Sequence, residues 1–138
     1  MSDNKPLLEL ADSLLPKLNY AVDLQNLAAS VGFDWPNIDG IIDKIHEEID
    51  EVKAETNIPD NHARLLDEMG DLLFACTNLA RHLNIDPEAA LEAGNQKFYR
   101  RFTQLEKIAQ INKQDLKTLT LDELDSLWEQ VKRDERQF

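Results

Sequence analysis

The stretch RLLDEMGDLLFACTNLA, residues 64–80, decides the fold, because its apolar residues recur with the period of an α-helix. The stretch KIHEEIDEVKAE, residues 44–55, has the same period, and a short loop would fold the two helices against each other. Each helix carries two acids three residues apart, which puts both carboxylates on one side of the helix. The four acids are Glu48, Glu51, Glu68 and Asp71. Four carboxylates that converge from two helices form an oxygen-rich site suited to a hard divalent cation, above all Mg²⁺.

Apolar periodicity predicts helices along the rest of the chain as well. The expected helices span residues 7–31 with a break at Pro16, 39–56, 62–83 and 86–110, and a short last helix follows the capping-box residues Thr120 and Glu123. Only four Gly and five Pro occur, and no strand-like alternation is present. The pattern predicts a single all-α domain over residues 1–138. Helix 62–83 has apolar residues on two faces, which fits a central helix of a bundle or one shared across a dimer interface.

The composition limits the functions to consider. The 138 residues carry a net charge of −12, which argues against a bare nucleic-acid or anionic-membrane surface. The single cysteine, Cys76, cannot form an internal disulfide, and we expect it to be a small buried thiol in a reducing compartment. No apolar run approaches the length of a membrane span, and the N-terminus lacks a signal-peptide pattern. We therefore expect a cytoplasmic protein with no nucleic-acid and no membrane partner.

Helical geometry separates the acids of the EEIDE run. Glu48 falls roughly 70° and Glu51 roughly 130° from the centre of the apolar stripe, on the same flank as Lys44, whereas Glu47 lies about 170° away and should point to water. A solvated acidic face is the common alternative for such a run. Two features favour a metal site instead: both pairs border an apolar stripe, where an unpaired carboxylate is costly to desolvate, and the second pair interrupts an otherwise apolar segment.

A local cationic stripe lies further along the chain. Lys97 and Arg101 are four residues apart and share a helical face, with Phe98 and Phe102 on the adjacent apolar one. In so acidic a chain, these cations beside a carboxylate–metal site indicate a polyanion such as a triphosphate. Pairing with nearby acids is the alternative. Trp128 on the last helix offers a surface for a base, although an amphipathic helix more often uses Trp in the core.

Several motifs together resemble one protein family. They are EExxE at residues 47–51, ExxD at 68–71, NQKFYRRF at 95–102, ASVGFDWP at 29–36 and LDSLWEQVK at 124–132. In this order they resemble the catalytic C-terminal domain of the MazG-type nucleoside triphosphate pyrophosphohydrolases, over about residues 20–135. The resemblance implies an all-α fold with a four-helix core and a short extra C-terminal helix, a homodimer, and dependence on Mg²⁺, with Mn²⁺ as a substitute.

The resemblance also implies a reaction and its residues. Such enzymes split a nucleoside triphosphate between the α and β phosphates, giving a monophosphate and pyrophosphate. The metal ligands would be Glu48, Glu51, Glu68 and Asp71. The substrate-binding residues would be Lys97 and Arg101 on the phosphates and Trp128 near the nucleotide, with Lys44 and Arg64 as further candidates for phosphate contacts. A carboxylate not fully used by the metal, Glu51 or Glu47, would take the proton of the attacking water. Many family members carry two such domains, and this chain has one.

Three other functions stay open at the level of sequence. The chain could be restricted to dUTP or dCTP, or could be a phosphoribosyl-ATP pyrophosphohydrolase that uses the same acidic helices. It could also be a helical dimerisation or regulatory module without catalysis, whose acids form a solvated face. The acids do not decide the preference for a base.

Overall fold

The computed structural model describes residues 5–137, which form two compact units that divide between Ala90 and Leu91. Five α-helices and two short 3₁₀ helices make up the described residues, and no strand occurs within residues 5–137. The predicted all-α class is therefore confirmed. None of the helices within residues 5–137 is long and apolar enough to cross a membrane.

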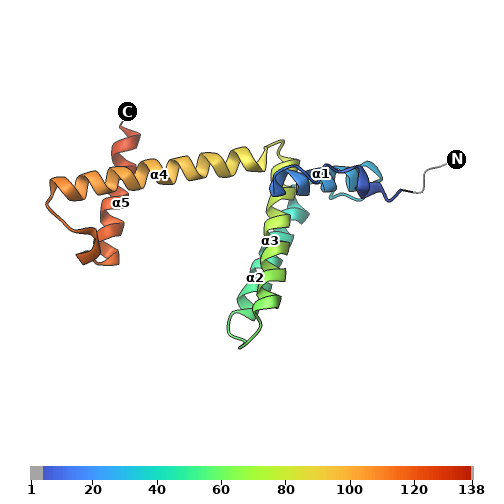
Figure 1. The fold of residues 1–138 in the computed structure, drawn as a ribbon, viewed down its shortest axis with the longest axis horizontal. Coiled ribbons are helices and arrows are strands. Elements are labelled where there is room, and N and C mark those ends of the chain that lie inside the picture. The colour runs from blue at the N-terminus through green and yellow to red at the C-terminus, as the bar shows by residue number, and fades with distance from the viewer. Residues whose placement is uncertain (1–4, 138) are drawn as a thin grey trace. The chain divides into compact units, whose positions relative to one another are not determined.

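The first unit is built around α3 (His62–His82). Helix α2 (Ile38–Glu55) packs along α3, and the two lie side by side with the connecting loop at one end (Figure 1). Helix α1 (Lys17–Ser30) packs against α3 as well, and the 3₁₀ helix η1 (Leu7–Leu10) packs on α1. The pairing of α2 with α3 brings the two acidic stretches together.

Proline and glycine set the ends of α1. The helix begins directly after Pro16, whose fixed φ suits a helix start, so the predicted helix over 7–31 is divided into η1 and α1. Past its end, Gly32 has φ 90°, and the N–H groups of Gly32 and Phe33 donate to the last carbonyls of the helix. The chain then turns towards Asn37, which caps α2 by accepting a hydrogen bond from the N–H of Asp39 at 3.0 Å.

Helix α4 (Pro87–Ile111) begins with Pro87 at its first position, and the Asp86 carboxylate accepts from the N–H of Glu88 at 3.0 Å, as the sequence predicts. From Leu91 onward it belongs to the second unit, with the 3₁₀ helix η2 (Leu116–Thr118) and α5 (Leu121–Arg136). The predicted capping box opens α5. The core of this unit consists of Leu105, Ala109, Leu127 and Val131.

One face of α3 is more exposed than the sequence predicts. Cys76, expected to be buried, is exposed. It continues a row with Leu66, Met69 and Leu73, which are 69%, 41% and 52% exposed. These residues recur every three or four positions and so share one side of α3. The apolar stripe of this helix therefore divides into a side that packs on α1 and α2 and a side that faces outward in the described chain.

Candidate metal and ligand site

The packing of α2 on α3 brings three of the predicted acids together. Carboxylate oxygens of Glu48, Glu68 and Asp71 all lie within 4.8 Å of one another. Glu48 is only 3% exposed, because its flank of α2 faces α3. Charged carboxylates are seldom buried unless a cation or hydrogen bonds compensate them, so this cluster requires a source of positive charge.

Lys44 supplies part of that charge. Its Nζ lies 3.1 Å from Oε1 of Glu48, one helical turn away, and the hydrogen bond to Glu48 is the main reason why the pKa of Lys44 is raised. The other oxygen, Oε2 of Glu48, and Oε2 of Glu68 are buried and have no hydrogen-bond partner among the described residues. Two buried, unpartnered carboxylate oxygens beside a third carboxylate fit a hard divalent cation, which prefers oxygen ligands.

Glu51 lies next to this cluster. Its pKa is raised to about 7 by hydrogen bonding to Glu68, then by partial removal from water, then by the charge of Glu48. The pKa of Asp71 is also raised, first by burial and then by the charges of Asp67 and Glu48. The crowding of like charges thus favours protonated carboxyls when no cation compensates them.

Glu47 points away from the cluster, as the helical geometry predicts. Its side chain is 57% exposed, and its carboxylate lies 3.4 Å from Lys44 on the outer flank of α2. The adjacent residues Glu47 and Glu48 therefore have different environments, because consecutive side chains on an α-helix point in directions about 100° apart.

A cavity of about 780 Å³ lies beside the acids within the first unit. Lys44, Glu48 and Asp71 line one part of it. Three aromatic side chains, Phe33, Trp35 and Phe74, line another part. This volume is in the range of ligand pockets, which combine apolar walls with a few polar groups.

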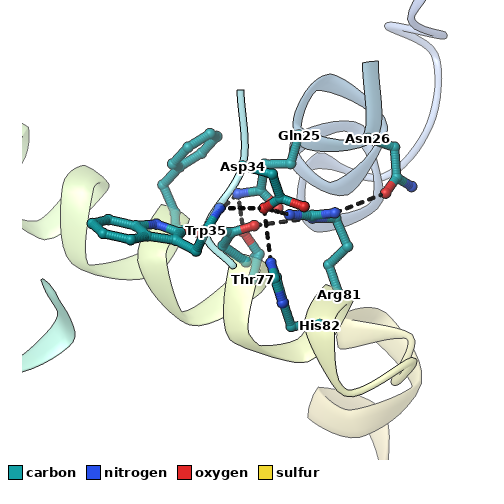
Figure 2. A network of polar contacts seen from close by, with 9 residues as sticks. Gln25, Asn26, Asp34, Trp35, Thr77, Arg81 and His82 are labelled. Carbon is teal, nitrogen blue, oxygen red and sulfur yellow. Dashed lines mark hydrogen bonds and ion pairs between the residues drawn. The ribbon is translucent and has the colours of Figure 1, made fainter. Parts of the chain in front are cut away.

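The aromatic residues Phe33 and Trp35 come from the turn between α1 and α2, and Asp34 ties this turn to the end of α3. Its Oδ1 lies 2.8 Å from Nε2 of His82 and accepts a hydrogen bond from Arg81 (Figure 2). Partial burial acts to raise the pKa of Asp34, but the hydrogen bonds of His82 and Arg81 and the N–H of Trp35 outweigh it and lower the pKa to about 2. Asp34 is thus a carboxylate held in its charged form.

Gln25 on α1 is the buried polar residue of the cavity wall, with 7% exposure. Its Nε2 donates to the carbonyl of Phe74 at 3.0 Å and to Oγ1 of Thr77 at 3.2 Å. A carbonyl only accepts, so these contacts fix which end of the amide faces α3. Oε1 of Gln25 is buried and has no partner among the described residues. The unpaired group of this amide is therefore a hydrogen-bond acceptor.

The other predicted site residues have different partners. Arg64 lies 3.6 Å from Glu55 with its side chain 73% exposed. In the second unit, Nε of Arg101 lies 3.0 Å from Oε2 of Glu135, and the Trp128 ring packs 5.6 Å from that of Phe98 beside the core. Lys97 is exposed on α4. The contacts of Lys97, Arg101, Trp128 and Arg64 with a substrate remain predictions.

No sequence pattern indicates the roles of Gln25, Asp34 and Arg81. Residues 33–36 belong to one of the motifs that resemble the family, but nothing in the local pattern links them to residues almost fifty positions later. Gln25 is one polar residue in an amphipathic helix, and its burial depends on the packing of α1 on α3.

Residues 5–137 thus form a helical protein in which carboxylates from two packed helices cluster in an arrangement that could hold a metal ion. Residues 23–98, more than half of the chain, match the family described as phosphoribosyl-ATP pyrophosphohydrolase. The chain therefore belongs to this family of pyrophosphohydrolase-like helical domains.

Individual relatives agree with this assignment. The chain is 44% identical over 122 residues to a nucleoside triphosphate pyrophosphohydrolase of Escherichia coli K12, which covers 88% of this chain and 46% of that protein. It is 41% identical over 119 residues to the nucleoside triphosphate pyrophosphohydrolase/pyrophosphatase MazG of Thermotoga maritima, covering 86% and 45%. The predicted resemblance to MazG-type proteins is confirmed. The chain spans about half the length of these relatives.

Proposed function

We propose that residues 1–138 act as a single enzyme domain that hydrolyses nucleoside triphosphates between the α and β phosphates, giving a nucleoside monophosphate and pyrophosphate. The observation that carries the proposal is the cavity of the first unit, which has the carboxylates of Glu48 and Asp71 on one part of its wall and aromatic rings on another. A nucleotide has the matching division into a charged phosphate chain and a planar base. The names of the E. coli and T. maritima relatives agree with this reaction.

The proposed metal ligands are Glu48, Glu68 and Asp71, with Glu51 as the fourth, and the proposed cation is Mg²⁺. The buried oxygens of Glu48 and Glu68 that lack a partner among the described residues support this choice. When bound, the ion would neutralise phosphate charge and lower the pKa of a coordinated water. Mn²⁺ prefers similar oxygen ligands and would substitute.

Other residues are proposed to bind the phosphates, to transfer the proton and to contact the nucleotide. Lys44 holds Glu48 in place through the 3.1 Å contact and lines the cavity, where its charge suits a phosphate oxygen. Of the two carboxylates left open for proton transfer, Glu51 is favoured over Glu47, because Glu51 neighbours Glu68 whereas Glu47 is exposed and pairs with Lys44. Lys97 and Arg101 are proposed to contact the phosphates, and Trp128 the nucleotide.

A homodimer in the cytoplasm is part of the proposal. The outward row of Leu66, Met69 and Leu73 on α3 supports it, since contiguous exposed apolar residues are typical of interaction surfaces. Light scattering would give the mass in solution. A monomer at micromolar concentration would contradict this part of the proposal without affecting the reaction.

The reaction itself is tested by release of pyrophosphate. The purified domain is incubated with ATP, GTP, CTP, UTP and the deoxynucleotides dUTP and dCTP, with and without Mg²⁺, beside the Glu68→Gln variant. The proposal predicts Mg²⁺-dependent release of pyrophosphate that the variant loses. Hydrolysis of no triphosphate, together with no stabilisation by Mg²⁺, would favour the non-catalytic helical module.

A second candidate, phosphoribosyl-ATP as substrate, is favoured by the description of the matched family. Adding phosphoribosyl-ATP to the panel separates the two. A kcat/KM for phosphoribosyl-ATP that exceeds that for every simple triphosphate by tenfold or more would favour the second candidate.

A further inference from the structure

The aromatic part of the cavity wall belongs to a turn that has little regular structure of its own. Phe33 and Trp35 are 81% and 42% exposed, and they flank Asp34 in the segment between α1 and α2. The ends of this segment are fixed locally, by the Gly32 cap of α1 and the Asn37 cap of α2. The position of the two rings relative to α3 therefore depends on contacts made in the middle of the turn.

Asp34 makes those contacts with a single oxygen. Oδ1 accepts from the N–H of Trp35 at 2.8 Å, lies 2.8 Å from Nε2 of His82, and accepts from the guanidinium of Arg81. Figure 2 shows Asp34 facing the Arg81 and His82 side chains from the end of α3, with the Trp35 ring pointing away from them. One carboxylate oxygen thus joins the backbone of the aromatic turn to the helix that carries Glu68 and Asp71.

The α3 side of this junction is itself held in place. Nε of Arg81 donates to Oδ1 of Asn78 at 3.0 Å, and its NH1 group lies 3.4 Å from Oδ1 of Asn26 on α1. The side chains of Arg81 and His82 are only 12% and 14% exposed. Hydrogen bonds to charged groups in such partly dry surroundings are stronger and more directional than exposed ones. The turn is therefore fastened to a rigid support.

We infer that Asp34 is a positioning residue that holds the Phe33–Trp35 wall at the distance from the acids that a nucleotide requires, so that the planar base packs on the aromatic rings while the phosphates meet the carboxylate site. This inference rests on the proposed function and assigns to it the residue that sets base binding. Asp34 does not touch the reacting atoms. Its effect on catalysis passes through the rings on either side of it.

The kinetic signature of this role is a change in KM with little change in kcat. Base–aromatic stacking is worth about tenfold to a hundredfold in affinity, so Asp34→Asn should raise KM for the preferred triphosphate by about tenfold and leave kcat within about threefold. In the Phe33→Ala/Trp35→Ala background the same substitution should change KM by less than about twofold, because both rings through which Asp34 acts are gone. Asp86→Asn, the same change at the cap of α4, is the matched control and should leave KM unchanged.

Two substitutions at His82 distinguish the loss of the contact with Asp34 from a general loss of folding. His82→Gln keeps an N–H group that reaches Asp34, and His82→Leu removes it, while both leave the Arg81–Asp34 pair in place. The inference predicts that His82→Leu raises KM and that His82→Gln has a KM close to that of the natural protein. Equal KM values for both variants, or a KM effect of Asp34→Asn that persists unchanged in the Phe33→Ala/Trp35→Ala background, would overturn it.

A spectroscopic readout separates this inference from the proposed reaction. The chain contains two tryptophans, so the response of Trp35 is the part of the emission change that the natural protein shows and the Trp35→Phe variant lacks. Titration with ATP, GTP, CTP and UTP in the presence of Mg²⁺ should quench the Trp35 emission, and Asp34→Asn should weaken the apparent affinity by about tenfold. Quenching without pyrophosphate release would remove the proposed reaction and keep the inference. Absence of quenching by every nucleotide would overturn the inference even if pyrophosphate were released.

Discussion

The indole of Trp35 lies so close to the backbone of Gly40 that a Cβ atom on residue 40 would come within 2.5 Å of ring atom Cε3. Gly40 belongs to the first turn of α2, where its conformation is ordinary, so this glycine is required for space rather than for φ. The Trp35 ring thus packs directly against the backbone of α2 at Gly40. Together with the Asp34 junction, this contact determines where one aromatic wall of the cavity stands.

Gly40→Ala should therefore displace Trp35. An added Cβ favours the helix by about 1 kcal/mol, which offsets part of the clash, so we expect the melting temperature to change little while KM for the triphosphate rises by about tenfold or more. Gly94→Ala is the control, because a Cβ there meets no atom within 4 Å. It should stabilise the protein by roughly 0.5–1 kcal/mol without changing KM. Equal KM values in the two variants would contradict the spatial role of Gly40.

The carboxylate cluster leads to a prediction that compares neighbouring glutamates. Glu48→Gln should lower kcat by about a hundredfold or more and weaken stabilisation by Mg²⁺, because it removes the charge of the buried member of the three clustered acids. Glu47→Gln should change neither by more than about twofold, because that side chain is exposed. Thermal melting against Mg²⁺ concentration and pyrophosphate release provide the measurements.

The stability of the metal-free protein is a second test of the proposed cation site. Hydrogen bonding to Glu68, partial removal from water and the charge of Glu48 raise the pKa of Glu51 to about 7, so the charged cluster is disfavoured without a cation. Glu68→Gln should reduce this charge, and the variant should be as stable as the natural protein or more stable in EDTA, yet less stable in millimolar Mg²⁺. A loss of stability in both conditions would mean that Glu68 is needed for packing rather than for a cation.

The distance over which a contact acts explains which features the sequence predicted. Spacing within one or two helical turns predicts three features that agree with the structure. They are the helices α2 and α3, the outward position of Glu47 and the capping box of Thr120. The convergence of Glu48 with Glu68 and Asp71 needed only two helices joined by a short loop. Such features depend on local geometry alone.

The other parts of the site depend on tertiary packing. Asp34 meets Arg81 across 47 positions, and Gln25 meets Thr77 across 52, so no local pattern reveals either pair. The exposure of Cys76 was predicted wrongly for a related reason. Apolar spacing shows that a residue lies on a stripe of α3, but the width of the face that α1 and α2 cover is set by how three helices pack.

The lowered pKa of Asp34 makes stability depend on acid pH. Its pKa falls from 3.8 to about 2 on folding, so the folded state favours the charged form, and the stabilisation is present above pH 4 and lost as the pH falls towards 2. Asp34→Asn should cost about 1–2 kcal/mol of unfolding free energy at neutral pH. The difference from the natural protein should shrink between pH 4 and pH 2 in urea titrations. A constant difference across that range would show that ionisation of Asp34 does not contribute.

Two adjacent arginines of α4 offer the last comparison. Nε of Arg101 and Nε of Arg100 lie 3.0 Å and 3.2 Å from the two oxygens of Glu135, and their side chains are 23% and 61% exposed. Only Arg101 is proposed to contact phosphate. Arg101→Met should lower kcat/KM by about tenfold or more, as expected for a lost hydrogen bond to a charged group, and Arg100→Met by less than about twofold.

The shared partner Glu135 separates phosphate binding from a structural effect of Arg101. Glu135→Gln removes the carboxylate from both arginines but leaves the Arg101 charge, so kcat/KM should be preserved, and stability should change little because solvent screens these ion pairs. Pyrophosphate release and urea unfolding of the three variants provide the comparison. If Glu135→Gln lowers kcat/KM as much as Arg101→Met, Arg101 acts by joining α4 to α5 and not by binding substrate.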